Sequence, residues 1–167
     1  MMEIKDVRDT LQKNPHGKVW GQRDLAQINR IILHQELGEG TTESVNNYHI
    51  SDACHVSSGG TPKICYHFTI EKDGSVYWCN SLEEIVWHTK TQNTCGVGIM
   101  LVGDFDGENH VGKSVPTEEQ EKSFYKLTRM LLSDLELPCS EVYGHCHFGK
   151  PACPGTVAEQ WIENIRS

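Results

Sequence analysis

A nearly uninterrupted apolar run, GVGIMLVG at residues 96–103, constrains the fold of this chain more than any other feature. A strand that is apolar at almost every position is typical of a sheet whose two faces are both covered by helices. Residues 31–33 form a second short apolar run, which predicts a buried strand ending at His34. We therefore expect an α/β fold with a central mixed β-sheet flanked by helices.

Residues 64–78 have the pattern of a β-hairpin. Apolar and aromatic side chains alternate at positions 64, 66, 68 and 70, and an Asp-Gly turn signal at 73–74 precedes a new apolar run at 76–78. Alternation places successive side chains on opposite faces of a strand. Tyr66 and His67 are therefore expected to point in opposite directions.

The clearest predicted helix follows Thr117, where a hydroxyl and a glutamine three residues later form a capping-box pattern. Apolar residues recur at helical spacing from there until Pro138 ends the helix. We also expect a short helix around residues 44–53, a short strand at 142–145 and a closing helix at 157–165.

The chain is long enough for one substantial core and too short for two ordinary domains, which predicts a single domain over residues 1–167. Residues 1–30 are expected to be a helical lead-in, because Ile4, Val7 and Leu11 recur at helical spacing. This segment is polar and lacks the apolar core of a secretory signal, so we expect synthesis in the cytoplasm. No apolar run approaches the roughly 20 residues of a membrane-spanning helix.

The composition excludes one class of partner and one kind of scaffold. The 15 Lys and Arg against 23 Asp and Glu give a formal net charge of −8, which disfavours nucleic acid binding. The 7 cysteines are an odd number in a sequence without an export signal, so a disulfide framework is not expected. Most should be buried thiols, and at least one is a candidate metal ligand.

Three candidate metal ligands follow predicted elements: His34 after one strand, His145 after another, and Cys153 in the loop PACPG. Two imidazoles and a thiolate suffice for zinc, and they would leave a fourth position open for water, as in catalytic sites. The competing interpretation is a hydrogen-bonded histidine and a packed thiol, and spacing alone does not separate the two. His147 is an alternative ligand, because on a strand it would share a face with His145.

Five segments in the same order carry a resemblance to a known family: INRIILHQ, CYHFTIEKDGSVY, VWHTKTQNTCGVGIMLVGDF, PTEEQ and VYGHCHFGKPACPG. From about residue 28 to residue 161 the chain resembles the zinc amidases that include phage endolysins of the N-acetylmuramoyl-L-alanine amidase type and the related peptidoglycan recognition proteins. The resemblance implies a peptidoglycan-recognition-protein-like fold. It also implies a catalytic domain that cuts peptidoglycan between the muramic acid lactyl group and the first L-alanine of the stem peptide.

The resemblance further implies that His34, His145 and Cys153 hold Zn2+ and that Tyr66 lies beside the ion. Zinc polarises an amide carbonyl and activates a bound water. The hydroxyl of Tyr66 can donate a hydrogen bond to the oxyanion that forms, and Lys150 is the second candidate catalytic donor.

Two further residues are candidates for substrate binding. The resemblance implies that His88 lines the substrate cleft, whereas Trp87 is expected first to be a structural aromatic residue and second to contact substrate. The expected partner is peptidoglycan, bound by a monomer that reaches the cell wall after host lysis or membrane permeabilisation.

The chain departs from the family pattern in two places. Some members have a catalytic Glu in the buried strand, where this chain has Met100, so it resembles the branch that works without that carboxylate. In the phage branch a Lys commonly stands two residues before the cysteine ligand, where this chain has Pro151, with Lys150 one step further back.

Two other functions compete with a zinc amidase. A non-catalytic peptidoglycan sensor of the same fold generally lacks the cysteine ligand, so the presence of Cys153 favours catalysis. A cysteine hydrolase would use Cys153 as the nucleophile and a histidine as the base. Chelation distinguishes these functions, because a zinc enzyme should lose activity and recover it with added zinc.

Overall fold

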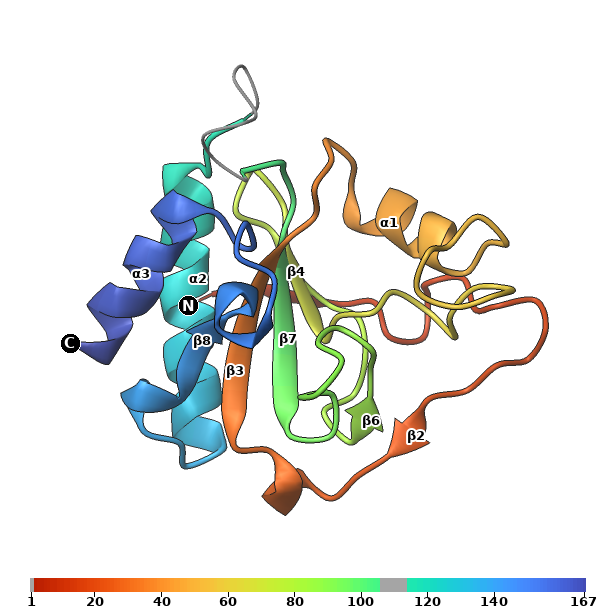
Figure 1. The fold of residues 1–167 in the computed structure, drawn as a ribbon, viewed down its shortest axis with the longest axis horizontal. Helices are drawn as coiled ribbons and strands as arrows, with labels where there is room; N and C mark the ends of the chain where they lie inside the picture. Colours follow the sequence, from red (N-terminus) through yellow and green to blue (C-terminus); the bar gives the residue numbers. More distant parts are fainter. Residues whose placement is uncertain (1, 106–113) are drawn as a thin grey trace.

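The computed structural model describes residues 2–105 and 114–167, and within them six strands form the central sheet (Figure 1). Their order across the sheet is β1-β5-β4-β7-β3-β8. Neighbouring strands are parallel except in the hairpin β4–β5, so the sheet is mixed, as expected. The strand bounds are β1 (Ile4–Asp6), β3 (Arg30–Gln35), β4 (Phe68–Ile70), β5 (Val76–Trp78), β7 (Gly96–Leu101) and β8 (Val142–Gly144).

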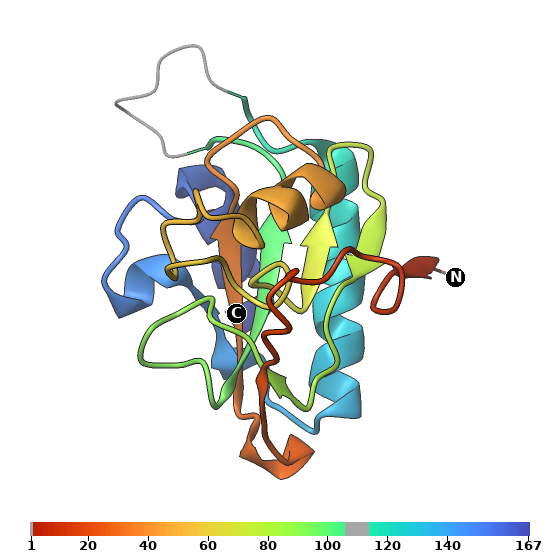
Figure 2. The ribbon, with the colours of Figure 1, turned by 90° about the vertical axis from the view of Figure 1, so that its right-hand side faces the viewer.

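Within the described residues, three α-helices flank the sheet. Figures 1 and 2 show α1 (Thr42–His49) on one face and the pair α2 (Glu118–Asp134) and α3 (Thr156–Arg166) on the other. The predicted capping box is present: the backbone N–H of Gln120 donates to Thr117 Oγ1 over 3.0 Å, and the Thr117 N–H donates to Gln120 Oε1 over 3.0 Å. Such a cap stabilises a helix by roughly 1 kcal/mol.

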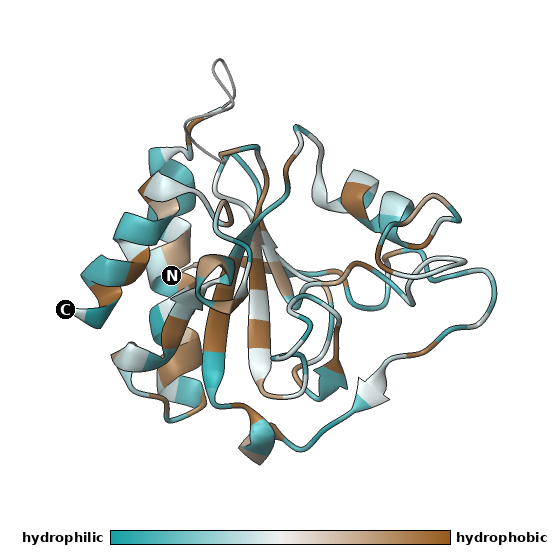
Figure 3. Cartoon of the chain, in the orientation of Figure 1, coloured by the Kyte–Doolittle hydropathy of each residue, from teal (hydrophilic) through white to brown (hydrophobic). Residues whose placement is uncertain are grey.

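Strand β7 is the apolar run of the sequence and lies between β4 and β3. All of its residues are buried, and Figure 3 shows hydrophobic colouring along β3 and β7 where they lie side by side. Val97, Ile99 and Leu101 belong to the core cluster that α2 and α3 share, whereas Met100 belongs to a second cluster with Val45 of α1. The prediction that helices cover both faces of this strand is confirmed.

The predicted hairpin is confirmed, with β4 and β5 paired antiparallel. Strand β4 begins at Phe68, so the residues before it, Tyr66 and His67, lie outside the strand, with His67 in a bend. They still face opposite ways. Tyr66 packs against His34 on the cleft side, whereas His67 Nδ1 accepts a hydrogen bond from the backbone N–H of Gly98 over 3.1 Å.

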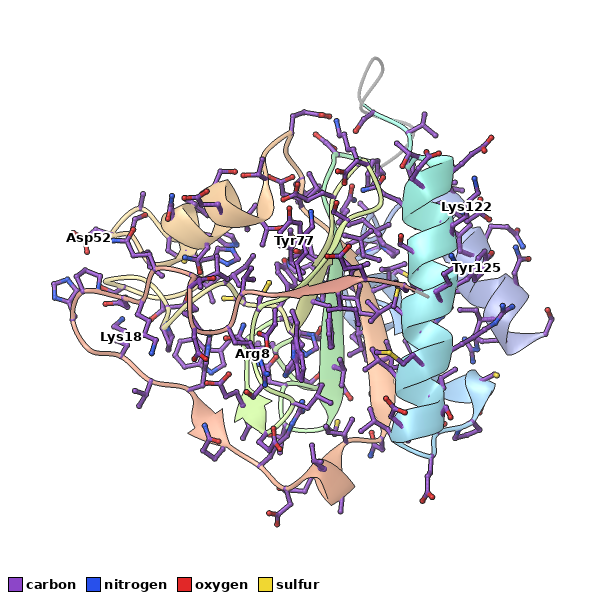
Figure 4. The ribbon with its side chains drawn as sticks, turned by 180° about the vertical axis from the view of Figure 1, so that it is seen from behind. Arg8, Lys18, Asp52, Tyr77, Lys122 and Tyr125 are labelled. Atoms are coloured by element: carbon purple, nitrogen blue, oxygen red, sulfur yellow. The ribbon has the colours of Figure 1, made fainter. Side chains whose placement is uncertain are left out.

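The expectation of a helical lead-in is wrong. Ile4 lies in the edge strand β1 and pairs in parallel with Val76 of β5. Val7 and Leu11 pack against the second core cluster, and the guanidinium of Arg8, labelled in the view from behind, lies 3.5 Å from the ring centroid of Trp78 (Figure 4). Apolar residues three and four apart are compatible with a helix and also with an irregular segment that contacts the core at intervals. The pairing of β1 with β5 selects the irregular segment.

The remaining elements are short. Strands β2 (Gly21–Gln22) and β6 (Glu84–Ile85) form a separate antiparallel pair, and the 3-10 turns are η1 (Leu25–Gln27), η2 (Cys139–Glu141) and η3 (His145–Phe148). Among the described residues no helix is both long and apolar enough to cross a membrane.

Candidate metal centre

The two histidines of the candidate centre, His34 and His145, lie at the carboxyl ends of the adjacent parallel strands β3 and β8. Leu33 of β3 pairs with Gly144, the last residue of β8, so the next residues, His34 within β3 and His145 just after β8, lie side by side. Their ring centroids are 4.6 Å apart. Parallel neighbours whose carboxyl ends meet at one edge thus bring together side chains that lie far apart in the sequence.

The third side chain, Cys153, comes from the loop that follows η3. Its backbone is held by two hydrogen bonds: the Cys146 N–H donates to the Cys153 carbonyl over 2.7 Å, and the Cys153 N–H donates to the Lys150 carbonyl over 2.9 Å. Gln35 ties this loop to β3, because its Nε2 donates to the Ala152 carbonyl over 2.6 Å. The backbone N–H of Gln35 also donates to Cys153 Sγ over 3.4 Å.

The donor atoms of His34, His145 and Cys153 all lie within 4.8 Å of one another. The sulfur of Cys153 is 4.0 Å from Nδ1 of His34. Zinc binds imidazole nitrogen at about 2.0–2.1 Å and thiolate sulfur at about 2.3 Å, so small side-chain rotations would bring all three donors onto one ion. Both the spacing and the chemistry of this donor set fit zinc.

Burial keeps the two imidazoles uncharged. It lowers the pKa of His34 well below the ordinary value and, with the charge of Lys150, lowers the pKa of His145 to about 4. Both rings are therefore neutral near pH 7, which is the form that binds a metal. Burial raises the pKa of the Cys153 thiol to about 12, and a bound metal ion would remove that proton.

The expectation that His145 and His147 share a strand face is wrong. Strand β8 ends at Gly144, and both histidines lie in the 3-10 turn η3, where residues two apart diverge. His147 is exposed, and its Nδ1 lies 3.1 Å from the backbone N of Gly144. Geometry therefore separates the two histidines: His145 lies in the donor group and His147 does not.

Tyr66 and Lys150 both line the cleft that contains the donor group. The ring centroid of Tyr66 is 5.2 Å from that of His34, and burial raises the pKa of the phenol above its ordinary value. The hydroxyl is therefore a neutral donor near pH 7. Lys150 is exposed at the edge of the cleft, and its positive charge contributes to lowering the pKa values of His145 and Cys153.

The cleft has a volume of about 430 Å³ and a polar floor of histidines, with Met100 also buried in its lining. Its rim carries four exposed apolar or aromatic side chains: Leu37, Tyr48, Val56 and Trp87. Exposed apolar groups around a polar cleft are typical of a surface that binds a ligand.

Trp87 and His88 line the same cleft but lie in different environments. Trp87 is 40% exposed and packs edge-on against the buried Trp20, with ring centroids 5.3 Å apart. His88 is only 6% exposed, and its Nδ1 lies 3.1 Å from Nε2 of His34. Trp87 is thus accessible to a ligand, whereas the ring of His88 is mostly covered by protein.

The residues of the cleft and its support that the sequence interpretation missed include Gln35, His49 and Thr89. His49 lines the cleft from the end of α1, and Thr89 Oγ1 lies 3.3 Å from His34 Nε2. Only Gln35 offered a sequence signal, since it is a polar residue directly after His34 in an otherwise apolar strand. The other two reach the site only through the tertiary fold, His49 from α1 and Thr89 from a loop.

The chain matches the protein family described as N-acetylmuramoyl-L-alanine amidase over residues 24–156. No curated protein sequence matches it.

Three solved structures are similar to the whole chain. The N-acetylmuramoyl-L-alanine amidase LysC from Clostridium intestinale URNW has a TM-score of 0.73 at 22% identity, covering 99% of this chain and 96% of that chain. The Ph2119 endolysin from Thermus scotoductus MAT2119 bacteriophage Ph2119 has a TM-score of 0.75 at 19% identity, covering 99% of both chains. Bumblebee PGRP-SA has a TM-score of 0.77 at 20% identity, covering 98% of this chain and 95% of that chain. These likenesses show the shared fold.

Proposed function

The chain belongs to the N-acetylmuramoyl-L-alanine amidase family, which it matches over residues 24–156, and we propose that it works as a zinc hydrolase. It is a peptidoglycan hydrolase that cleaves the amide bond between N-acetylmuramic acid and L-alanine. The observation that carries the proposal of zinc is the convergence of His34, His145 and Cys153, whose donor atoms lie within 4.8 Å of one another. Two nitrogens and one sulfur are a donor set that zinc prefers.

When bound, zinc polarises a carbonyl group and lowers the pKa of a coordinated water to about 7. Cleavage of an amide also requires a donor for the negative charge that develops on the carbonyl oxygen. Tyr66 supplies a neutral phenolic hydroxyl beside His34, and Lys150 supplies a positive charge at the edge of the same cleft. We assign both residues to stabilising that charge.

Strand β7 offers no carboxylate to this chemistry. Met100 pairs in register with His34 and is fully buried in the cleft lining. A thioether neither accepts nor releases a proton near pH 7. Tyr66 and Lys150 therefore carry the proton and charge interactions that a carboxylate in this strand would otherwise share.

Substrate binding is assigned to the cleft and its rim. The exposed indole of Trp87 offers a flat apolar surface to a sugar ring or a stem peptide, and Leu37, Tyr48 and Val56 extend that surface around the opening. His88 contributes a small part of the floor beneath them. We propose that the partner is peptidoglycan and that the enzyme acts on the cell wall as a monomer.

The two competing functions account for the site less well. A sensor that does not cut has no use for a third donor, yet Cys153 is held by backbone hydrogen bonds beside the two histidines. A cysteine nucleophile needs a lowered pKa. Burial instead raises the pKa of Cys153 to about 12, which opposes attack by its thiolate.

Metal removal combined with product analysis tests the proposal. Digestion of purified peptidoglycan should release new alanine amino groups without new reducing sugar ends. Treatment with a chelator should abolish this release, and added zinc should restore it. New reducing ends would refute the assignment of the bond, whereas activity that survives complete metal removal would refute zinc and favour the cysteine hydrolase.

A further inference from the structure

The two ring nitrogens of His34 face different surroundings. Nδ1 points to the donor group, 4.0 Å from Cys153 Sγ. Nε2 points into the protein, 3.1 Å from His88 Nδ1 and 3.3 Å from Thr89 Oγ1. A histidine that binds a metal usually donates its other ring N–H to a carboxylate, a carbonyl or water. Here the partner is a second, buried imidazole.

The second ring, His88, is held in one tautomer by the backbone. Its Nε2 lies 3.3 Å from the carbonyl oxygen of Gly96, and a carbonyl can only accept, so this nitrogen carries the proton. In the neutral ring Nδ1 then has a lone pair and accepts from His34 Nε2. The remaining nitrogen of His34, Nδ1, is thereby left unprotonated on the side of Cys153.

Neighbouring groups support these proton positions on His34 and His88. The hydroxyl of Thr89 lies 3.0 Å from His88 Nδ1 and within reach of His34 Nε2, so it bridges the two rings. Nη1 of the buried Arg23 donates to the Gly96 carbonyl over 2.9 Å and to the carbonyls of Asn93 and Thr94 over 3.1 and 3.0 Å. The loop that carries His88 and the carbonyl that accepts from it are fixed by one guanidinium.

The ring of His88 packs against β7 at two glycines, where the absence of side chains leaves room for it. A Cβ atom at Gly98 would lie 2.7 Å from Cγ of His88, and one at Gly96 would lie 3.1 Å from Cε1. Contacts as short as the first do not occur without a shift of the ring or the strand. The alternation of glycines at 96 and 98 in the buried run therefore accommodates this imidazole.

We infer that His88 is a positioning residue of the metal centre: by accepting the Nε2 proton of His34 it presents the Nδ1 lone pair of His34 to the metal. This role rests on the proposed function only in taking His34 as a ligand. It differs from substrate contact, because it acts through His34 and predicts an effect on metal affinity. The hydroxyl of Thr89 and the carbonyl of Gly96 hold the His88 ring in place.

Three variants test the role: His88→Leu removes the acceptor, His88→Gln retains an amide oxygen, and Thr89→Val removes the bridge. Zinc affinity, measured by competition with a chelator, should fall about 10- to 100-fold in His88→Leu. It should fall less in His88→Gln and in Thr89→Val. The matched control His147→Leu removes an exposed histidine outside the donor group and should retain wild-type affinity.

Nitrogen-15 NMR of the zinc-loaded wild-type protein gives a readout that does not depend on activity or on folding of a variant. His34 should carry its proton on Nε2 and bind zinc through Nδ1, and His88 should carry its proton on Nε2. Zinc on Nε2 of His34 overturns the inference. Wild-type zinc affinity in His88→Leu with a raised KM also overturns it, and assigns His88 to substrate contact. If His88→Leu does not fold, the NMR pattern and Thr89→Val decide.

Failure of the inference and failure of the proposed function give different results. A wild-type protein that binds zinc and releases alanine amino groups, with His88→Leu binding zinc equally well, removes only the role of His88. A wild-type protein that binds no zinc removes both.

Discussion

The imidazoles of His34 and His145 lie with their ring centroids 4.6 Å apart, at the ends of the adjacent parallel strands β3 and β8. His34 lies within β3, and His145 is the first residue of the turn η3 that directly follows β8. A rigid pair of donors loses little conformational entropy when it binds an ion. Cys153 lies in the loop that follows η3, and Gln35 ties that loop to β3.

Removal of any one donor should abolish metal binding. We expect His34→Ala, His145→Ala and Cys153→Ala to lose zinc and amidase activity together, because two remaining protein donors hold the ion poorly. Metal content by mass spectrometry checks this, with His147→Ala as the matched control that should keep an equimolar amount of zinc. Full zinc occupancy in His34→Ala, or metal lost in His147→Ala and kept in His145→Ala, contradicts the assignment.

The two candidate catalytic donors should be separable from metal binding. Tyr66→Phe and Lys150→Ala are each expected to lower turnover by roughly 10²-fold with zinc retained, the scale of losing one oxyanion donor. Steady-state kinetics and zinc content measure the two effects. Lys126→Ala removes a lysine from the exposed side of α2 and controls for the loss of charge. Nearly full turnover in Lys150→Ala alone would reduce Lys150 to a solvated loop charge.

Leu37 combines backbone strain with a place on the cleft rim. Its φ of 66° lies in the left-handed region, and its side chain is 58% exposed. Leu37→Gly should relieve strain, raising stability by up to about 1 kcal/mol, while it raises KM by removing apolar contact.

Glu136 is the matched control for this prediction. It has a φ of 53° and follows the last residues of α2, away from the cleft. Glu136→Gly should raise the melting temperature as Leu37→Gly does, with KM unchanged. Equal KM values in both variants would remove Leu37 from substrate binding.

His49 should make stability depend on pH. Burial, with a smaller contribution from the charge of His55, lowers its pKa to about 4, against an ordinary value of 6.5. Protons therefore bind the unfolded chain more readily than the folded one, and the contribution of His49 is present above pH 6.5 and is lost as the pH falls toward 4. The shift corresponds to roughly 3 kcal/mol.

His49→Asn isolates this contribution, since an amide oxygen can replace Nδ1 as the acceptor of the Cys65 N–H, now 3.0 Å away. Urea unfolding at pH 7, 5 and 4 should give a smaller loss of unfolding free energy in His49→Asn than in the wild type. Parallel pH profiles would show that His49 does not titrate with unfolding.

Local sequence patterns predicted the parts of the fold that depend on local physics. The buried strand at residues 96–101 and the helix that starts after Thr117 follow from apolar continuity and a capping box, and both are confirmed. The amino-terminal prediction is wrong because the pairing of Ile4 with Val76 is a tertiary contact that periodicity does not encode.

In the candidate site, too, local patterns predicted some features and tertiary contacts set the others. The apolar runs before them placed His34 and His145 at strand ends, whereas the parallel pairing that brings the two strands together is a tertiary feature. The turn η3, which separates His145 from His147, depends on the loop at residues 150–153 that bonds back to Cys146. The contacts of His34 with His88 and Thr89 join segments brought together only by the complete fold.

The edge-on pair of Trp20 and Trp87 gives the protein an optical reporter of its own cleft. Of the 4 tryptophans, Trp20 and Trp161 are buried and Trp78 is partly covered, so Trp87 at 40% exposure is the indole most open to an aqueous quencher. A glycan or peptide lying over the rim would shield that indole. Intrinsic fluorescence and its quenching by acrylamide can then follow occupancy of the cleft in real time, without a label and without turnover.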